Sequence, residues 1–370
     1  MKAINAVLAV LLVSVGGCTG SSRHPTPTPS PAVRTAAGSG PTASPSIQRL
    51  PGLVLTADLA EPPARWQRVA FIPFSGRAQD LGRMTFPEGP NSQPTSFGVA
   101  LDGSIWIDDR WKSRVAHYSP TGRYLGAIAG LRDRGDDLVL VSDRVVVLTR
   151  EVSLSGKGAL MVWSGPGGMW TQATVNENGR PLRTGFFAPS PSEVIVELGG
   201  WDDDPSGAGP RGFAQVDIPG SGQVHLLPGY PFGSGMYFRI LPVPGSDHEY
   251  RLQFSGPSGE SVQPVGIRVQ VGDPGATRIV PAIAGVGEET AIGDDVVMFV
   301  RVAPSRPADV DRYGGGWWLL RVGRSPVLWE RLPGPGVGDD IQARHIAAGP
   351  DGGIYLMVAR KSGMEILRRP

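Results

Sequence analysis

The sequence predicts an all-β fold, a six-bladed β-propeller that follows a signal peptide and a disordered linker rich in Ser, Thr and Pro. Short β-branched runs such as 145–148 and 296–300 are bounded by turn-forming residues, which is typical of strands. The 52 Gly and 36 Pro residues leave few places for long helices. A two-strand unit recurs along the chain, and repetition is the usual way to fold so long an all-β sequence.

The first 18 residues carry the features of an export signal. Lys2 supplies a positive charge, and an apolar run follows from Ile4 to Val15. This run is too short to cross a bilayer core of about 30 Å as a helix. A positive start, a short apolar run and small residues before a cleavage site are typical of secretory signals. Cys18 is the single cysteine of the chain, so it has no internal disulfide partner.

The segment Val15-Gly16-Gly17-Cys18 resembles the lipobox of bacterial lipoprotein signals, which is an aliphatic residue, two small residues and cysteine. The resemblance implies that residues 1–17 are a signal peptide cleaved before Cys18. It also implies a diacylglycerol group on the Cys18 sulfur and usually an acyl chain on its amino group. The protein would then lie on the extracytoplasmic face of the cell membrane, held by lipid. The alternative is an ordinary secretory signal that happens to contain a cysteine.

Residues 18–50 are expected to form a disordered tether behind the lipid. Ser, Thr, Pro, Ala and Gly dominate from Thr19 to Ser46, and proline occupies every second position from Pro25 to Pro31. So few apolar side chains cannot offset the entropy of ordering. Alternating proline favours polyproline II at about 3.1 Å per residue, so this tether would hold a domain up to roughly 90 Å from the lipid.

The propeller is assigned to residues 64–370. Each repeated unit is an apolar strand, a tight polar turn and a second apolar strand. The units cover residues 98–107, 138–147, 186–196, 240–252, 290–299 and 346–356. Their second strands are about 40 to 58 residues apart, and a four-stranded blade needs about 40–50 residues. The units therefore predict six blades.

The first unit carries a longer motif over residues 97–130. It contains Phe97-Gly98-Val99-Ala100, then Asp102-Gly103-Ser104-Ile105-Trp106-Ile107, then Asp109, Arg114-Val115 and Ser119-Pro120-Thr121-Gly122. This pattern resembles an NHL-type propeller repeat, which implies the propeller fold and an ion pair between Asp109 and Arg114 that braces the blade. The family pattern has asparagine two residues before the arginine, where this chain has Lys112. The match is partial in the last unit and poor in the middle four, so it says little about function.

The last unit predicts how the ring closes. The chain has only three strand-like segments there, near 345–348, 353–358 and 364–368. The early segment 67–73 has no partner of its own. We expect it to complete the last blade from outside, because closure removes two exposed sheet edges.

Candidate ligand-binding residues lie in an acidic insertion. Residues 201–207 read Trp-Asp-Asp-Asp-Pro-Ser-Gly, and the part from Asp202 onward is like the opening of a calcium loop. The twelfth position counted from Asp202 is Phe213 rather than glutamate, which excludes an EF-hand. Asp202 and Asp204 remain candidate calcium ligands, and the alternative is a solvated acidic turn. Trp201 is a candidate binding aromatic, because apolar packing is less expected in a Gly- and Asp-rich insertion.

Other catalytic signals are weak. His117, His225, His248 and His345 are scattered without the spacing of a metal motif, although folding could bring them together. The sequence has no G-x-S-x-G elbow, no P-loop and no cysteine after Cys18. Of two adjacent tryptophans, Trp317 and Trp318, at least one is expected in a blade core.

The charge balance and the motifs limit the classes of function that fit the sequence. Cleavage of the signal removes Lys2 from the 35 basic residues, so the remaining chain has 34 basic and 34 acidic residues. It therefore lacks the clustered basic excess that binds nucleic acid. Because catalytic motifs are missing, the leading hypothesis is a lipid-anchored binding or scaffold module for an envelope protein or glycan, without a cofactor. The alternative is a calcium-dependent propeller hydrolase or lyase acting at the channel mouth. A third hypothesis is a purely structural role at the cell wall.

Overall fold

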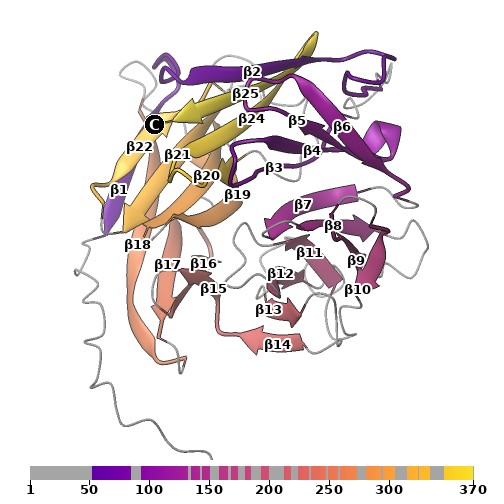
Figure 1. The fold of residues 1–370 in the computed structure, drawn as a ribbon. Coiled ribbons are helices and arrows are strands. Elements are labelled where there is room, and N and C mark those ends of the chain that lie inside the picture. Colours follow the sequence, from indigo (N-terminus) through magenta and orange to yellow (C-terminus); the bar gives the residue numbers. More distant parts are fainter. Residues whose placement is uncertain are drawn as a thin grey trace, which may run out of the picture. The chain divides into compact units, whose positions relative to one another are not determined.

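Six sheets make up the described part of the chain and follow one another in chain order around a ring (Figure 1). This is the six-bladed β-propeller that the sequence predicts, so the predicted fold class is confirmed. The computed structural model describes residues 52–84, 93–131, 135–141, 144–150, 158–165, 168–173, 180–184, 193–199, 212–217, 224–232, 235–246, 249–256, 259–272, 281–292, 295–304, 315–323, 325–333 and 346–369. All of them belong to one unit, Pro45–Pro370.

The first three blades each contain four consecutive strands. Blade 1 consists of β3 (Phe97–Val99), β4 (Ile105–Asp109), β5 (Arg114–Tyr118) and β6 (Tyr124–Ala129). Blade 2 consists of β7 (Gly135–Val141), β8 (Arg144–Arg150), β9 (Gly158–Trp163) and β10 (Thr171–Ala173). Blade 3 consists of β11 (Arg180–Thr184), β12 (Glu193–Gly199), β13 (Gly212–Asp217) and β14 (Val224–Leu227).

Blades 4, 5 and 6 follow, and blades 4 and 6 each include one strand from the start of the described chain. Blade 4 consists of β15 (Tyr230–Phe232), β16 (Met236–Pro242), β17 (Glu249–Ser255), β18 (Ser261–Gly272) and the added β1 (Leu53–Asp58). Blade 5 consists of β19 (Pro281–Ile292), β20 (Asp295–Pro304), β21 (Gly316–Gly323) and β22 (Leu328–Arg331). Blade 6 consists of β23 (Ile346–Ala348), β24 (Ile354–Arg360), β25 (Gly363–Arg369) and β2 (Gln67–Pro73).

The second strand of a blade is apolar on both faces because each face packs against a different neighbour. In β20, Val296 and Met298 lie in a core shared with blade 4, while Val297 and Phe299 lie in a core shared with blade 6. Successive side chains of a strand point to opposite faces, so a continuous apolar run fills two cores at once. This explains why these strands read as unbroken runs in the sequence.

The apolar cores join each blade to the next, and one of them joins the last blade to the first. Phe97 and Ile105 of blade 1 share a core with Tyr355 and Met357 of blade 6 and with Ile72 of β2. β2 pairs antiparallel with β25, so it is the outer strand of blade 6. The ring is therefore closed by hydrogen bonds and by a common core.

β1 lies upstream of residue 64, where the sequence places the start of the propeller. It pairs in parallel with β18 on the outer edge of blade 4, with Leu53 opposite Ile267. Its inward side chains Leu55 and Ala57 are buried in the core of blades 4 and 5. Residues 53–73, named here the strap, therefore extend from the edge of blade 4 to the edge of blade 6.

Side chains of β22 in blade 5 hold the middle of the strap. Trp329 Nε1 donates to the carbonyl of Thr56 at 2.8 Å. Arg331 Nη1 donates to the carbonyl of Leu59 at 2.8 Å and to that of Glu61. The carbonyl of Arg331 accepts from the N–H of Ala64 at 2.8 Å. These contacts satisfy backbone groups that the strap would otherwise leave on an exposed edge.

Blade 4 differs from the sequence-based assignment. The fourth predicted unit, 240–252, covers β16 and β17, which are the second and third strands rather than the first and second. The inner strand is β15, three residues long, with Pro231 at its centre. So short a strand with a proline carries almost no strand signal.

The described residues contain one helical element, the 3₁₀ turn Arg110–Lys112. No helix in this part of the chain has the length and apolarity needed to span a membrane.

Candidate functional site

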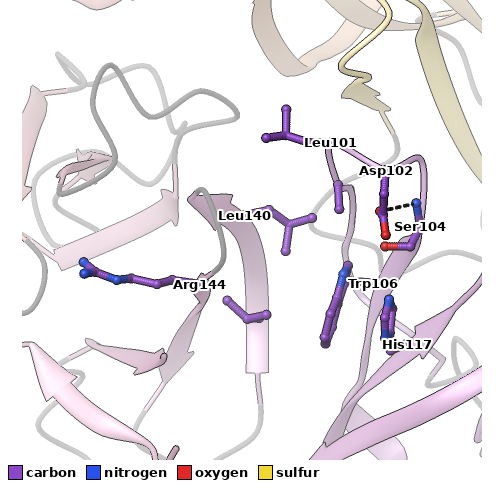
Figure 2. A pocket seen from close by; sticks show the side chains of 9 residues that line it. Leu101, Asp102, Ser104, Trp106, His117, Leu140 and Arg144 are labelled. Atoms are coloured by element: carbon purple, nitrogen blue, oxygen red, sulfur yellow. Dashed lines mark hydrogen bonds between the residues drawn. The ribbon is translucent and has the colours of Figure 1, made fainter. Parts of the chain in front are cut away.

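A pocket of about 250 Å³ lies between blades 1 and 2 (Figure 2). Blade 1 supplies the residues of the turn between β3 and β4 and two ring side chains from β4 and β5, while blade 2 supplies residues on either side of the turn between β7 and β8. Together these are Ala100, Leu101, Asp102, Ser104, Trp106, His117, Leu140, Arg144 and Val145.

The turn between β3 and β4 is fixed by its own hydrogen bonds. The N–H of Ala100 donates to the carbonyl of Ser104 at 2.9 Å, and the N–H of Gly103 donates to the carbonyl of Ala100 at 2.9 Å. Gly103 has a φ of 80°, a left-handed conformation that favours glycine. The carboxylate of Asp102 accepts from the N–H of Ser104 at 2.9 Å. The Asp-Gly-Ser sequence thus presents Asp102 and Leu101 at the pocket rim.

Two stacked rings form the blade 1 wall. Trp106 of β4 pairs directly with His117 of β5 in the strand register. Side chains directly opposite each other in a pair of strands lie close together. The ring centroids of Trp106 and His117 are 3.8 Å apart and the rings are nearly parallel, at 11°. Trp163 of β9 lies 6.0 Å from Trp106 at a tilt of 47°. Side chains of both blades therefore hold this wall in place.

The pocket carries two opposite charges and one neutral ring. Hydrogen bonds from the Ser104 hydroxyl and N–H lower the pKa of Asp102, so its carboxylate is ionised at neutral pH. Burial lowers the pKa of His117 against the opposing attraction of Asp102, so the imidazole is neutral there. Figure 2 shows Arg144 on the blade 2 side, opposite Asp102, with Leu140 between them.

Ser104 and His117 are not bonded to each other in this pocket as a nucleophile and its base would be. Ser104 is 3% exposed, and its hydroxyl is bonded to Asp102 rather than to His117. His117 Nε2 is buried and has no hydrogen-bond partner within the described residues. A general base needs hydrogen-bond contact with the group it deprotonates. The pocket instead offers an apolar wall with the Asp102 carboxylate at its rim.

The ion pair expected between Asp109 and Arg114 is confirmed, and it serves the fold. Arg114 Nε donates to Asp109 Oδ2 at 2.9 Å, and the two side chains are 10% and 0% exposed. The remaining guanidinium nitrogens donate to the carbonyls of Ala78 and Asp80 at 2.5 and 2.7 Å. Lys112 Nζ also donates to the Asp80 carbonyl, at 2.7 Å. Both basic side chains thus fasten the segment that links β2 to blade 1.

Of the residues singled out from the sequence, His117 lines this pocket. Cys18, Trp201, Asp202 and Asp204 lie outside the described residues, as do His248 and His345. His225 is on β14 in blade 3, whereas His117 is on β5 in blade 1. Within the described ranges no group of His, Cys, Asp or Glu side chains could hold a metal ion. Trp318 is fully buried, as expected for a core tryptophan.

The pocket itself was not predicted from the sequence. A local signal was present, because the hairpin that places Trp106 on β4 also fixes His117 opposite it on β5. The other half of the pocket has no local signal. Leu140, Arg144 and Val145 reach it only because blade 2 packs beside blade 1.

Fold and site together define a closed propeller with a small amphipathic pocket between two blades. No family model and no curated protein sequence match the chain. Similar solved structures include the hydrazine synthase of Kuenenia stuttgartiensis, at 14% identity over 71% of this chain and 73% of that chain, with a TM-score of 0.47.

Two further solved structures are similar to this chain. The WD40 repeats of RRP9 are 14% identical over 75% of this chain and 81% of that chain, with a TM-score of 0.43. A luciferin-regenerating enzyme is 10% identical over 75% of this chain and 91% of that chain, also with a TM-score of 0.43. At these identities the similarity is one of fold and leaves the ligand of this chain open.

Proposed function

We propose that this protein is a lipid-anchored extracytoplasmic propeller that acts as a binding module for another envelope component. The observation that carries the proposal is the pocket between blades 1 and 2, with its apolar wall, its charged ends and the exposed Leu101 at its rim. Concave, largely apolar pockets with a few placed polar groups are the usual binding sites of proteins.

The position of the strap supports this function. The described chain enters the propeller at Leu53, on the edge of blade 4. The blades follow one another in chain order, so blade 4 lies on the far side of the ring from the junction of blades 1 and 2. A chain that enters the ring at blade 4 does so away from the pocket.

The anchor is tested by changing Cys18→Ser in the full-length chain. Because the lipid is attached through the Cys18 sulfur, we expect the variant to be unprocessed or released from the membrane. Cell fractionation and the mass of the N-terminal peptide would measure both effects. Membrane retention with normal cleavage of the variant would contradict lipid anchoring.

Calcium separates the binding module from the alternative of a calcium-dependent hydrolase or lyase. We expect addition of EDTA and then of calcium to leave the melting temperature unchanged, in the wild type and in Asp202→Ala alike. A ligand that binds only the folded state stabilises it by about 2.7 kcal/mol at a hundredfold excess over Kd. A rise of the melting temperature with calcium that Asp202→Ala abolishes would favour the enzyme instead.

A further inference from the structure

We propose that the pocket between blades 1 and 2 receives one apolar side chain of a protein partner. This inference rests on the proposed function and names the class of partner for the same site. Four features carry it: the size of the pocket, the exposure of its rim, the fixed position of its walls and the charge of Asp102.

The size of the pocket favours a single side chain over a whole small molecule. Pockets for drug-sized ligands are about 300–1,000 Å³. The present pocket, at about 250 Å³, is below that range but is large enough for an aliphatic or aromatic side chain. Hot spots of protein interfaces are of this kind, with one large side chain seated in a well-packed pocket.

The rim favours a macromolecule. Leu101 is 82% exposed at the edge of the pocket, beside the half-buried Ala100 and the exposed Asp102. A small molecule within the pocket would leave most of Leu101 in water, whereas a protein surface seated over the pocket would cover it. Most of the lining is apolar, so a glycan would find few groups to match its hydroxyls.

The walls of the pocket are already fixed. Trp106 is stacked on His117 and contacts Trp163 from the other blade, and the turn that holds Leu101 is closed by backbone hydrogen bonds. A partner therefore loses little free energy in ordering this surface, which is the advantage of a preorganised site.

The charge of Asp102 defines the surroundings of the partner's apolar side chain. Asp102 and Arg144 lie on opposite sides of the pocket (Figure 2). His117 is neutral at neutral pH, so it adds no third charge. A complementary partner carries a basic group toward Asp102, because complementary charges fix the orientation of an interface.

The test uses the full-length chain in its host cells, with a photo-reactive amino acid at Leu101 or, as a control, at Leu226. Leu226 is a matched site, because it is 74% exposed on β14 of blade 3, away from the pocket. We expect a protease-sensitive adduct at residue 101 and at least about tenfold less at residue 226, as for a hot spot compared with a neutral position. The adduct should map to a segment with an apolar residue next to a basic one.

A pocket-filling variant tests the cavity itself. In Ala100→Phe a ring occupies the pocket and no lining side chain is removed. In the control Ala127→Phe the same change is made on the exposed face of β6. Capture of the same partner by an amine-reactive crosslinker should fall about tenfold or more with Ala100→Phe and stay unchanged with Ala127→Phe.

The outcomes separate this inference from the proposed function. Equal adducts at 101 and 226, an adduct with glycan or lipid, or undiminished capture by Ala100→Phe would overturn the pocket as the protein site while the binding function stands. No partner captured by any reagent, at any site, would instead count against the binding function itself.

Discussion

Arg114 illustrates how a single buried charge holds two segments together. Its guanidinium binds the Asp109 carboxylate and two carbonyls of the segment between β2 and β3. Burial raises the pKa of Asp109, against the opposing effects of the Gly82 N–H and of Arg114. Asp109 is therefore stable as an anion only while its partners remain in place.

The first prediction follows from this pair. Arg114→Met should reduce the free energy of unfolding by about 3–5 kcal/mol at pH 7, because it leaves a buried carboxylate without its cation. The raised pKa of Asp109 gives the sign of the pH dependence: protonation favours the folded state, so the loss should be smaller near pH 4 than at pH 7. Urea unfolding at both pH values measures it, with the exposed Arg123→Met as control. An equal loss at both pH values would contradict this account.

The second prediction concerns His117. Its pKa is lowered by burial, so the unfolded chain takes up a proton before the folded chain does as the pH falls below about 6.5. Stability should therefore be complete above that pH and should decrease as the pH falls through the folded pKa.

Replacement of His117 by Leu should flatten this part of the pH dependence, because the variant has no imidazole to protonate there. His225→Leu is the matched control, because His225 is exposed on β14. Urea unfolding between pH 7.5 and 5 measures both. The idea fails if His117→Leu and wild type lose stability in parallel.

At the scale of elements, one strand of blade 5 holds the middle of the strap. β22 is short, yet Trp329 and Arg331 donate to three carbonyls of the strap, and Trp66 Nε1 donates to Glu330 at 2.9 Å. Arg331 also lies over the ring of the buried Trp318, at 5.7 Å from its centroid. The strap is therefore fastened to blade 5 by side chains and by one backbone hydrogen bond, from Ala64 to Arg331, rather than by a strand ladder.

The third prediction is that Arg331→Met loosens the strap locally. The change removes two charged hydrogen bonds and should reduce stability by about 1–2 kcal/mol, because the arginine is half-buried. Amide hydrogen exchange should rise in the strap around Leu59 and Glu61 and stay unchanged in β4 and β5. Arg123→Met again serves as control. Uniform exchange increases over all blades would show that the effect is global.

The elements that the sequence predicts best are those with two buried faces. The run Val296-Val297-Met298-Phe299-Val300 has no solvent-facing residue, so it reads as a strand without any context. β15 and β1 escape such reasoning, because the first is three residues with a central proline and the second gains its partner only from β18, far along the chain. Local periodicity does not predict which distant segments pair.

The residues of the candidate site also fall into two groups, those placed by local strand pairing and those placed by the packing of distant segments. Trp106 and His117 face each other across one hairpin, so their contact follows from local register. Asp102 and Arg144 belong to different blades and meet at one pocket only through the packing of sheets. A sequence repeat predicts that blades stand side by side, but it does not predict which turn residues come together.

At the scale of the whole molecule, the strap contributes the outer strand of two different blades. β2 completes blade 6 and shares the core of blades 6 and 1, whereas β1 adds a fifth strand to blade 4. Loss of β2 would open the ring, leaving β25 as an exposed edge and Phe97 and Ile105 without part of their cover. Loss of β1 would uncover the outer strand of a blade that already has four.

The fourth prediction compares two N-terminal truncations with a reference chain that starts at residue 47. A chain that starts at residue 64 should fold to a soluble protein with a lower melting temperature, because it keeps the closing strand β2. Deletion of residues 64–75 should abolish cooperative folding, because the ring then lacks its closing strand. Thermal unfolding followed by circular dichroism and size-exclusion chromatography measures both. If the second chain melted cooperatively as a soluble monomer, closure by β2 would not be what holds the propeller together, and the shared core of blades 6 and 1 would have to suffice alone.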